Sequence, residues 1–503
     1  MKKKREELMS VLDVAALRKH QSDYPSQLFD ALLSVSSELG REMFLVGGTV
    51  RDWLLERTPK DLDLTVQCDA VRCCHLLIHK LNGGTFVPLG TATEDAARVV
   101  WKGLIIDFSS FREKAGTIEE DLRLRDFTLN GMGISFPAFM DSSADLQLID
   151  PLLGARDLEH GILRACPNAF PSDPLRMLRA YRLQATFGFR LEPETLEQIR
   201  EHVSLLKRVS VERISYEMDL IIGSSRAHEV ISAMAESGLL FQVIPSLEEG
   251  VDMEQPESHH LDVFGHSLAA LGKMEEILKQ PEIFYPQCEE VLRDYLTGAK
   301  IVEVLKWSAL LHDLGKPTTH AIREDKGGRI TFYGHDETGR KLVQELGRTL
   351  RWSSEKRERV AALTGMHMHP FHLCNVRRRQ GISKKACLKL SKRAGDDLIG
   401  LFFLAMADSL AGKGEMKPTE MEEELAQLLC EVMETYRKDV APTLNGPRLL
   451  TGTDLIEHFS LTPGPNFSQL LDRLQEEQVE GKVKTREEAM AWVETLLASG
   501  NFN

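Results

Sequence analysis

FLVGGTVRDWLLERTPKDLDLT, residues 44–65, is the stretch of the chain that predicts its fold. Its apolar opening, residues 44–46, predicts a short buried strand. Gly47 and Gly48 follow, and because they lack Cβ atoms they allow backbone amides to approach a phosphate closely. Arg51 lies just beyond, where its guanidinium could hold the same phosphates. The stretch therefore predicts a phosphate-binding turn after a strand.

The end of the stretch carries two acidic residues separated by one leucine. Residues i and i+2 of a strand share a face, so the carboxylates of Asp61 and Asp63 would point the same way. Two like charges this close are costly unless a cation lies between them. Mg²⁺ binds through carboxylates together with substrate phosphates, and the spacing therefore favours a magnesium site. Taken alone, a Gly-Gly turn or an Asp-x-Asp pair is also typical of solvated strands and loops.

In the order strand, Gly-Gly, Arg and Asp-x-Asp, the stretch resembles the head of the nucleotidyltransferase superfamily. More narrowly, GGTVRD followed by DLDLT is similar to the bacterial-type (class II) tRNA CCA-adding enzymes and their poly(A) polymerase relatives. The resemblance implies an α+β fold class, with a small mixed β-sheet in an N-terminal head and all-α domains after it. It also implies that Gly47, Gly48 and Arg51 bind a nucleoside triphosphate and that Asp61 and Asp63 bind Mg²⁺.

A third acidic residue follows on another apolar segment. Trp101–Phe108, WKGLIIDF, predicts one strand that carries Asp107. From the residues alone, Asp107 is either a third carboxylate beside Asp61 and Asp63 or a strand-end residue in a turn. The superfamily places its third acid on such a strand, which favours a catalytic role.

Glu119–Met132, EEDLRLRDFTLNGM, resembles the EDLxRRDFTxNA segment of the family, with Leu124 in place of the first arginine. The resemblance implies that Arg125, Asp126 and Asn130 bind the ribose and the triphosphate. A guanidinium, a carboxylate and an amide are sufficient to hold a phosphate and sugar hydroxyls.

The connection that precedes this segment is short. Only Glu113–Thr117 separates it from the preceding strand, where full CCA-adding enzymes carry a long flexible loop. The shortening resembles the enzymes that add only the two cytidines, and some other loop-poor relatives.

PSDPLRMLRAYRL, residues 171–183, corresponds to the base-reading motif Glu-Asp-x-x-Arg of the family, with Ser172 in place of the glutamate. Pro174 suits the first turn of a helix, and Asp173 and Arg176 would lie one turn apart on one face. They could then present an acceptor and donors to the base of CTP or ATP. The alternative is a helix-terminal Asp that forms an i,i+3 ion pair.

Arg176, Arg179 and Arg182 recur at intervals of three. Such a row is more typical of a solvated helix face than of a ligand surface. Within the family resemblance, we nevertheless include Arg179 among the nucleotide-binding residues.

Histidines concentrate in the second half of the chain, with nine of the sixteen between residues 259 and 372. Histidines and aspartates recur there on apolar helices, in the order His266, His312, Asp313, His335, His367 or His369, and Asp408. Imidazole and carboxylate together suit a transition metal that keeps positions open for water. The order resembles the HD-domain metal-dependent phosphohydrolases, which implies Ni, Mn, Fe, Co or Mg²⁺ at this site.

Length and composition are those of a multidomain globular protein. The 503 residues are too many for one hydrophobic core, and no uninterrupted apolar run is long enough to span a membrane. Eight cysteines without a repeated C-x-x-C spacing indicate neither a disulfide framework nor a zinc ribbon, and we expect a cytoplasmic protein. The net charge of −14 does not predict tight non-specific RNA binding. Basic residues recur at 377–393, either as a solvated helix face or in contact with RNA backbone.

The expected domains are a helical segment at 1–40, the nucleotidyltransferase head at 41–150, a helical neck for base reading and RNA binding at 151–245, the HD domain at 257–425 and a helical tail at 440–503. The inward positions of the first helix would be Leu28, Leu32, Leu33 and Leu39.

The resemblance covers nearly the whole chain after residue 40. It implies a template-independent RNA nucleotidyltransferase that adds C, A or both to tRNA 3′ ends from CTP and ATP with Mg²⁺, by CCA or CC addition. A second, HD-domain phosphohydrolase activity accompanies it. Two alternatives stay open: a poly(A) polymerase, and an HD phosphohydrolase whose head only binds nucleotide or RNA. No membrane partner is expected, and the oligomeric state is not indicated.

Overall fold

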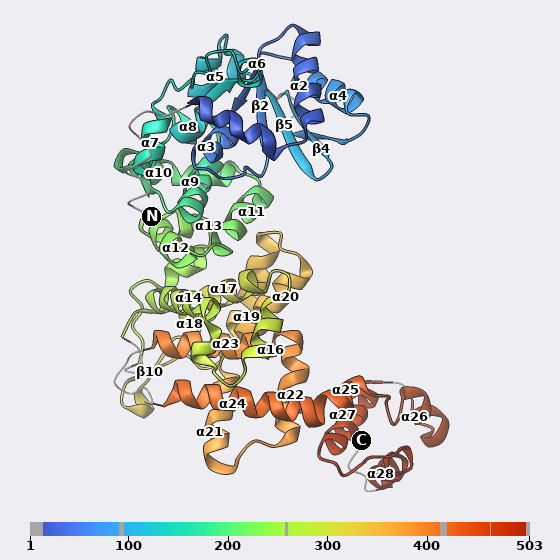
Figure 1. Ribbon diagram of the computed structural model, residues 1–503. Helices are drawn as coiled ribbons and strands as arrows, with labels where there is room; N and C mark the ends of the chain where they lie inside the picture. Colours follow the sequence, from blue (N-terminus) through green and yellow to red (C-terminus); the bar gives the residue numbers. More distant parts are fainter. Residues whose placement is uncertain (1–13, 90–94, 257–259, 413–419, 463, 499–503) are drawn as a thin grey trace. The chain divides into compact units, whose positions relative to one another are not determined.

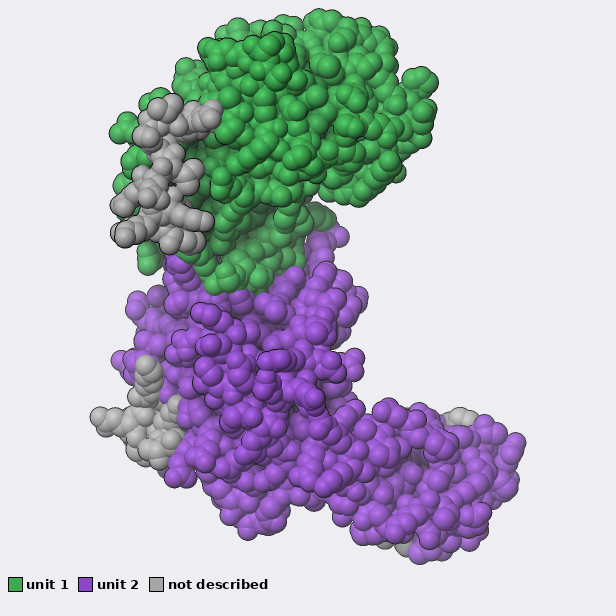
Figure 2. Space-filling view, viewed as in Figure 1, with its two compact units in different colours: residues 1–226, 233–242 green, residues 227–232, 243–503 purple. Residues whose placement is uncertain are grey.

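The computed structural model describes residues 14–89, 95–256, 260–412, 420–462 and 464–498 (Figure 1). The chain divides into two compact units, residues 1–226 with 233–242 and residues 227–232 with 243–503 (Figure 2). The first unit contains one six-stranded sheet with helices, and the second is almost entirely helical. The predicted α+β class is confirmed.

The sheet of the first unit holds the candidate site. Its strands are β1 (Met43–Val46), β2 (Leu62–Val66), β3 (Thr85–Leu89), β4 (Ala96–Trp101), β5 (Leu104–Ser110) and β6 (Gly133–Ser135), in the order β3-β4-β5-β2-β1-β6. Only the central pair, β2 and β5, runs parallel, and every other neighbouring pair is antiparallel. The sheet is therefore mixed, and its parallel pair places the ends of β2 and β5 side by side.

The helices of the first unit follow the sheet and extend beyond it. They are the 3-10 helix η1 (Val14–Asp23), α2 (Ser26–Leu39), α3 (Gly48–Leu54), α4 (Ala70–Lys80), α5 (Ile118–Arg123), α6 (Phe136–Met140), α7 (Gly154–His160), α8 (Ala169–Ser172), α9 (Leu175–Phe187), α10 (Pro193–His202), α11 (Val211–Ile222) and most of α13 (Leu239–Val243). Helix α12 (Ala227–Glu236) is divided between the two units. Short 3-10 turns lie at Arg112–Lys114, Thr128–Asn130 and Val203–Arg208, and a two-stranded pair is formed by β7 (Ile162–Leu163) and β8 (Arg190–Leu191). Helix α4 packs against β3, β4 and β5.

The segment that was predicted as one strand, Trp101–Phe108, is two strands. A two-residue turn at Lys102 and Gly103 separates β4 from β5, and both residues have positive φ, +48° and +81°. Positive φ at both central positions matches the right-handed twist of an antiparallel hairpin. The prediction was wrong because β-branched and aromatic residues flank the turn and conceal it. The hairpin places Arg98 directly opposite Asp107.

The N-terminal helix prediction holds only in part. Residues 14–23 form a 3-10 helix, α2 begins at Ser26, and residues 1–13 lie outside the described part of the chain. Leu28 and Leu32 are buried, whereas Leu33 is exposed and Leu39 is half-buried. The buried face of α2 recurs at intervals of three and four from Leu28, and Leu33 falls on the opposite side of the helix.

The helices of the second unit are α14 (Val263–Lys279), α15 (Pro281–Phe284), α16 (Glu289–Leu296), α17 (Ile301–Leu311), α18 (Lys316–Thr319), α19 (His335–Thr349), α20 (Ser354–Met366), α21 (His369–Gln380), α22 (Lys384–Ala394), α23 (Leu398–Ala411), α24 (Met421–Thr435), α25 (Ala441–Asn445), α26 (Gly452–Phe459), α27 (Pro465–Val479) and α28 (Arg486–Ala498). Shorter turns lie at Pro245–Gly250, Glu324–Lys326 and Gly395–Asp397, and a π-helical turn, η8, lies at Tyr436–Val440. A small hairpin joins β9 (Ala321–Arg323) to β10 (Arg329–Thr331).

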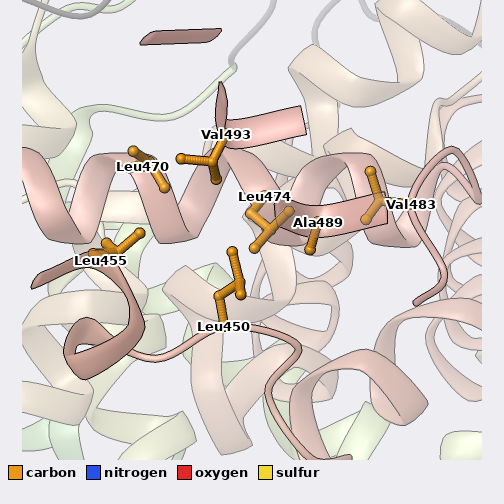
Figure 3. Packing of buried hydrophobic residues seen from close by; sticks show 7 residues of the cluster. All are labelled: Leu450, Leu455, Leu470, Leu474, Val483, Ala489 and Val493. Carbon is orange, nitrogen blue, oxygen red and sulfur yellow. The ribbon is translucent and has the colours of Figure 1, made fainter. Parts of the chain in front are cut away.

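Helix α23 is the centre of this unit, since nearly all of its residues are buried and α14, α17 and α24 pack against it. The tail has a small core of its own, made by Leu450, Leu455, Leu470, Leu474, Val483, Ala489 and Val493 (Figure 3).

The basic residues at 377–393 are largely neutralised within the chain. Arg377 and Arg378 pair with Glu431 and Glu424 of α24. The lysines of α22 pair with acids on η8 and α27: Lys384 with Asp439, Lys385 and Lys389 with Glu476, and Lys392 with Asp472. This row is therefore an intramolecular contact rather than a simple solvated face.

Candidate functional site

The glycine turn after β1 packs directly against the acidic strand. Gly47 has φ +63°, and a Cβ atom there would lie 2.9 Å from Nη1 of Arg125. A Cβ on Gly48 would lie 3.0 Å from Oδ2 of Asp63, to which the Gly48 amide donates a hydrogen bond of 3.0 Å. Thr49 completes the contact, because its hydroxyl accepts from the amide of Asp63 at 2.7 Å. Close approach thus explains both glycines.

The two acids of the Asp-x-Asp pair differ in their surroundings. Strand β2 begins at Leu62, so Asp61 lies just before it and Asp63 lies within it. Burial raises the pKa of Asp63 to about 6, with further raising by Asp107 and Asp61, while Arg125 and Arg51 oppose the shift. Burial and the neighbouring Asp107 also raise the pKa of Asp61. A divalent cation would relieve this crowding of negative charge, so the pair fits the group that the sequence implied.

Asp107 is a register neighbour of Asp63 on β5. Both of its oxygens accept from Arg98, at 2.7 Å from Nε and 2.8 Å from Nη2. Nη2 of Arg98 also lies 3.5 Å from Oδ2 of Asp61. Asp107 is therefore a neighbour of Asp63 on β2, and Arg98 on β4, the other neighbouring strand, binds its carboxylate.

A cavity of about 320 Å³ collects most of the predicted nucleotide-binding residues. The predicted residues that line it are Gly47, Gly48, Asp63, Asp107, Arg125, Asp126, Asn130, Asp173, Arg176 and Arg179. Arg51 lies beside them, since its Nη1 donates to Oδ1 of Asn130 at 2.6 Å and its guanidinium lies over the ring of Phe187. Segments that are far apart in sequence thus converge on one polar cavity.

Asp126 is held by two side chains within the first unit. Arg179 donates to Oδ2 from Nε at 2.9 Å, and Asn130 donates to Oδ1 from Nδ2 at 2.9 Å. Burial opposes ionisation of Asp126, but Arg179 and Arg176 hold its pKa well below the usual range. Its neighbour Arg125 is fixed by Asp121, 3.1 Å from Nη2. The segment is therefore a rigid ionic network.

The i,i+3 ion pair of Asp173 and Arg176, which the sequence left as the alternative to base reading, does not form in this structure. Asp173 accepts instead from Nη2 of Arg213 on α11, at 2.8 Å. The guanidinium of Arg176 donates to the backbone carbonyls of Leu124 at 3.2 Å and Arg125 at 3.3 Å. Both residues line the cavity, but each is oriented by a different element.

The row of arginines on α9 is not a solvated face. Arg176 contacts the backbone of the 124–125 segment, Arg179 pairs with Asp126, and Arg182 pairs with Glu217 at 2.6 Å. The interpretation as a solvated helix face was wrong because the acids that pair with the row lie about 35 to 55 residues away in sequence.

The histidines and aspartates of the second unit form two groups of possible metal ligands. One group is His266, His312 and Asp408, and the other is Asp313, His335 and His367; the ligand atoms within each group lie within 4.8 Å of one another. Asp313 lies between them. Its Oδ2 is 3.1 Å from Nε2 of His312, and its Oδ1 is 3.4 Å from Nε2 of His335.

Backbone carbonyls orient the imidazole rings of these groups. Nδ1 of His312 is 2.9 Å from the carbonyl of Ala309, and Nδ1 of His367 is 2.7 Å from that of Thr364. Each ring therefore turns its Nε2 atom towards the carboxylates. In the part of the chain that is described, Nε2 of His312 lies 3.1 Å from Oδ2 of Asp313 without meeting hydrogen-bond geometry. Imidazole nitrogens turned towards carboxylates, with one nitrogen outside hydrogen-bond geometry, fit a metal centre.

His369 does not join either group. Its Nε2 lies 2.8 Å from Nη1 of Arg393, which donates to it. Of the two residues that the sequence left open, His367 is the one that the structure brings to Asp313.

A second cavity, of about 580 Å³, opens beside this centre. Asp313, His335, His367 and Asp408 line it together with Lys316, Arg329, Phe332, Tyr333, Phe371 and His372. Nζ of Lys316 lies 2.6 Å from Oδ2 of Asp313. The cavity thus combines ligand atoms, cationic side chains and aromatic rings.

Four protein-family models match the chain in order. They are the poly A polymerase head domain at residues 43–164, the probable RNA and SrmB-binding site of polymerase A at 188–250, the HD domain at 263–413 and a putative tRNA nucleotidyltransferase domain 2 at 447–493.

Curated relatives match over almost the whole length. The A-adding tRNA nucleotidyltransferase of Deinococcus radiodurans is 31% identical, over 90% of this chain and 94% of that protein. The chain belongs to the bacterial-type tRNA nucleotidyltransferases with an HD domain. The CC-adding tRNA nucleotidyltransferase of Thermus thermophilus is 29% identical, over 90% of this chain and 93% of that protein.

Solved structures share the fold of this nucleotidyltransferase. A CCA-adding enzyme with ATP superposes with a TM-score of 0.61 at 20% identity, covering 95% of this chain and 96% of that one. The Thermotoga maritima CCA-adding enzyme complexed with tRNA gives a TM-score of 0.60 at 21% identity, covering 97% of this chain and 98% of that one.

Sequence reasoning missed several residues of the nucleotidyltransferase sites. Arg112 lines the first cavity and donates to Asp121, and Arg98 holds Asp107. Lys316 contacts Asp313 in the second. Arg112 directly precedes the short Glu113–Thr117 connection and Lys316 follows Asp313 by three residues, so both had local signals, whereas Arg98 had none. Within the described ranges, every helix is too short or too polar to cross a bilayer.

Proposed function

We propose that this nucleotidyltransferase adds cytidine, adenosine or both to the 3′ end of tRNA, using CTP and ATP in the cytoplasm. The observation that carries the proposal is the packing of the Gly47–Gly48 turn against Asp63, at the rim of a cavity that also holds Arg125 and Asp126. Two relatives that match 90% of this chain are tRNA nucleotidyltransferases, which supports tRNA as the substrate.

Each group in the first cavity has a role that its chemistry allows. Asp63, which lines the cavity, and Asp61, two residues earlier, would hold Mg²⁺, which would activate the primer 3′-hydroxyl and stabilise the departing pyrophosphate. Gly47 and Gly48 let the triphosphate approach the backbone closely, and Arg51 supplies positive charge beside it.

The remaining residues bind the sugar and select the base. Arg125 binds triphosphate, and Asp126 and Asn130, which are already joined by a 2.9 Å hydrogen bond, hold the ribose. Asp173 accepts from the base edge of CTP or ATP, and Arg176 donates to it. Arg179 acts by fixing Asp126.

The connection between β5 and α5 bears on base choice. It runs from Phe111 to Thr117, and Arg112 ties it to Asp121 through its amide at 2.9 Å and its guanidinium at 2.9 Å. A segment this short and this firmly held cannot swing far, since an extended residue spans only about 3.5 Å. We therefore expect efficient CC addition with poor addition of the final A, or commitment to one base.

Product length on a truncated tRNA tests the proposal. The purified protein is given tRNA lacking its 3′ CCA, and tRNA ending in CC, with CTP alone, ATP alone or both. Products of one to three added residues support tRNA nucleotidyltransferase activity. Rapid complete CCA formation would contradict the argument from the short connection, and long A tails from ATP alone would favour a poly(A) polymerase.

A second activity is supported by the metal-ligand groups around Asp313. We infer a metal-dependent phosphohydrolase whose ion, Ni, Mn, Fe, Co or Mg²⁺, is held by His266, His312, Asp313, His335, His367 and Asp408. The adjoining cavity contributes Lys316, Arg329 and His372, which suit a phosphate ester. Release of phosphate from nucleotides and cyclic phosphates, measured with each metal in turn, tests it.

A further inference from the structure

Arg98 contacts two of the three acids at the nucleotidyltransferase site. Its Nε and Nη2 atoms donate to separate oxygens of Asp107, at 2.7 and 2.8 Å, in a bidentate pair. Nη2 also lies 3.5 Å from Oδ2 of Asp61. A planar guanidinium with a permanent charge matches a carboxylate in this way better than any other side chain.

The sheet register explains why Asp107 meets both a carboxylate and an arginine. The parallel register of β2 and β5 sets Asp63 beside Asp107, and the antiparallel register of β4 and β5 sets Arg98 on its other side. Direct neighbours on adjacent strands point to the same face. Asp107 therefore lies between an acidic neighbour, Asp63, and a basic neighbour, Arg98. Both of its oxygens accept hydrogen bonds from Arg98.

The three acids do not converge as a set of metal ligands would. Over the described ranges, groups of three His, Cys, Asp or Glu ligand atoms within 4.8 Å of one another occur only around Asp313 and Asp408 in the second unit. Asp61, Asp63 and Asp107 form no such group, although Asp63 and Asp107 are adjacent in register. The arginine thus occupies both oxygens of Asp107, although it also reaches Asp61.

We propose that Arg98 is a positioning residue that holds Asp107 out of the metal coordination, so that Asp61 and Asp63 alone supply the carboxylate ligands. This inference rests on the proposed magnesium site. It assigns Asp107 to the arginine rather than to the ion. The guanidinium also reduces the repulsion between Asp107 and the other two acids without taking a ligand position.

Binding of Mn²⁺, a spectroscopic substitute for Mg²⁺, separates this role from a simple charge effect. Every protein is the full chain with Asp313→Ala, so that the second metal centre does not contribute, and free Mn²⁺ is measured by electron paramagnetic resonance. The variants are Arg98→Lys, which keeps the charge but loses the bidentate fork, and Arg98→Lys with Asp107→Asn. Lys60→Gln is the control for charge, because Lys60 is an exposed cation whose charge acts on Asp61.

If Arg98 withholds Asp107, Arg98→Lys adds a carboxylate ligand and tightens Mn²⁺ binding by about fivefold or more, because affinity rises with ligand charge. Asp107→Asn in the same chain removes the gain, and Lys60→Gln changes the affinity by less than about twofold, as expected for an exposed charge. Unchanged or weaker binding in Arg98→Lys overturns the proposal. If Asp61→Ala leaves Mn²⁺ binding intact, the magnesium site itself is misplaced, which is a separate failure.

Discussion

Asp173, at the end of α8, is paired with Arg213 on α11 across 2.8 Å, although forty residues separate them in sequence. Asp173 lines the nucleotide cavity, so the pair fixes the position of its carboxylate there. Arg213 lies outside the 171–183 motif that contains Asp173. Orientation of Asp173 therefore depends on the neck helix α11.

Arg213→Ala should impair base choice more than nucleotide binding. Loss of the ion pair frees the Asp173 carboxylate, and a misplaced reading group lowers discrimination between CTP and ATP by about fivefold or more. Single-nucleotide incorporation with each NTP measures the ratio, and Arg208→Ala, an exposed residue nearby in the sequence, is the control. Equal loss with both nucleotides would instead indicate a general folding defect.

Asp61→Ala should abolish nucleotide addition while leaving the fold intact. The residue lies just before β2, is half-buried, and shares the proposed cation site with Asp63. Without it, metal binding weakens and the rate falls by at least about a thousandfold, the size of effect seen when charge stabilisation is removed. Extension of tRNA is the assay and circular dichroism the folding check. Near-normal extension would show that the head has been assigned wrongly.

His312→Ala should eliminate metal-dependent phosphate release and spare nucleotide addition. The residue belongs to the second compact unit, whereas the nucleotide cavity belongs to the first, so coupling between the two sites should be small. Both activities are measured on the same preparation. Parallel loss of both in a folded protein would contradict independent sites.

Asp126→Asn should destabilise the first unit, because the partly exposed Arg179 would lose the buried carboxylate with which it pairs. Loss of a charge-assisted hydrogen bond to a partly exposed partner costs about 1–3 kcal/mol. The pKa of Asp126 is lowered in the folded protein, so its stabilisation is present above the unfolded pKa of about 3.9 and fades as the pH falls below it. The difference in urea unfolding between wild type and variant should therefore be largest near pH 7 and shrink below about pH 4.

Asp145→Asn provides the matched control for this series, because Asp145 is an exposed acid of the same unit that contacts only the nearby Gln147 among the described hydrogen bonds. A pH-independent difference for Asp126→Asn would show that the ion pair is not its source.

Glu476→Gln should loosen the tail from α22. The carboxylate accepts from Lys385 and Lys389, and its own side chain is almost fully buried. The neutral amide cannot balance two lysines, so limited proteolysis should cleave the segment around α25 faster, most clearly at low salt where charge matters most. Glu457→Gln, an exposed residue of the same tail, should behave as wild type. Identical digestion of both variants would refute the prediction.

Local patterns predicted the parts of the site that one short segment can specify. The strand alternation correctly predicted where Asp63 lies, and the missing Cβ atoms correctly predicted the close packing of Gly47 and Gly48. Both patterns depend only on a few residues that are neighbours in sequence. The fold class followed from the same patterns and from the resemblance that they carry.

Partners that come from distant segments could not be predicted in this way. Arg98 reaches Asp107 only because a turn at Lys102 and Gly103 folds one strand back on another, and the sequence was interpreted as a continuous strand there. Likewise, which of His367 and His369 meets Asp313 depends on where α20 ends and α21 begins.

The two-residue turn between β4 and β5 also fixes the register that sets Arg98 opposite Asp107. Side chains alternate between the faces of a strand, so inserting a single residue at Lys102–Gly103 would carry Arg98 to the opposite face of the sheet. The acids would keep their sequence and their strand, yet the third would lose its partner. The length of this turn thus determines which residue of β4 lies opposite Asp107. A relative with a longer turn should need a cation from a different position opposite this acid.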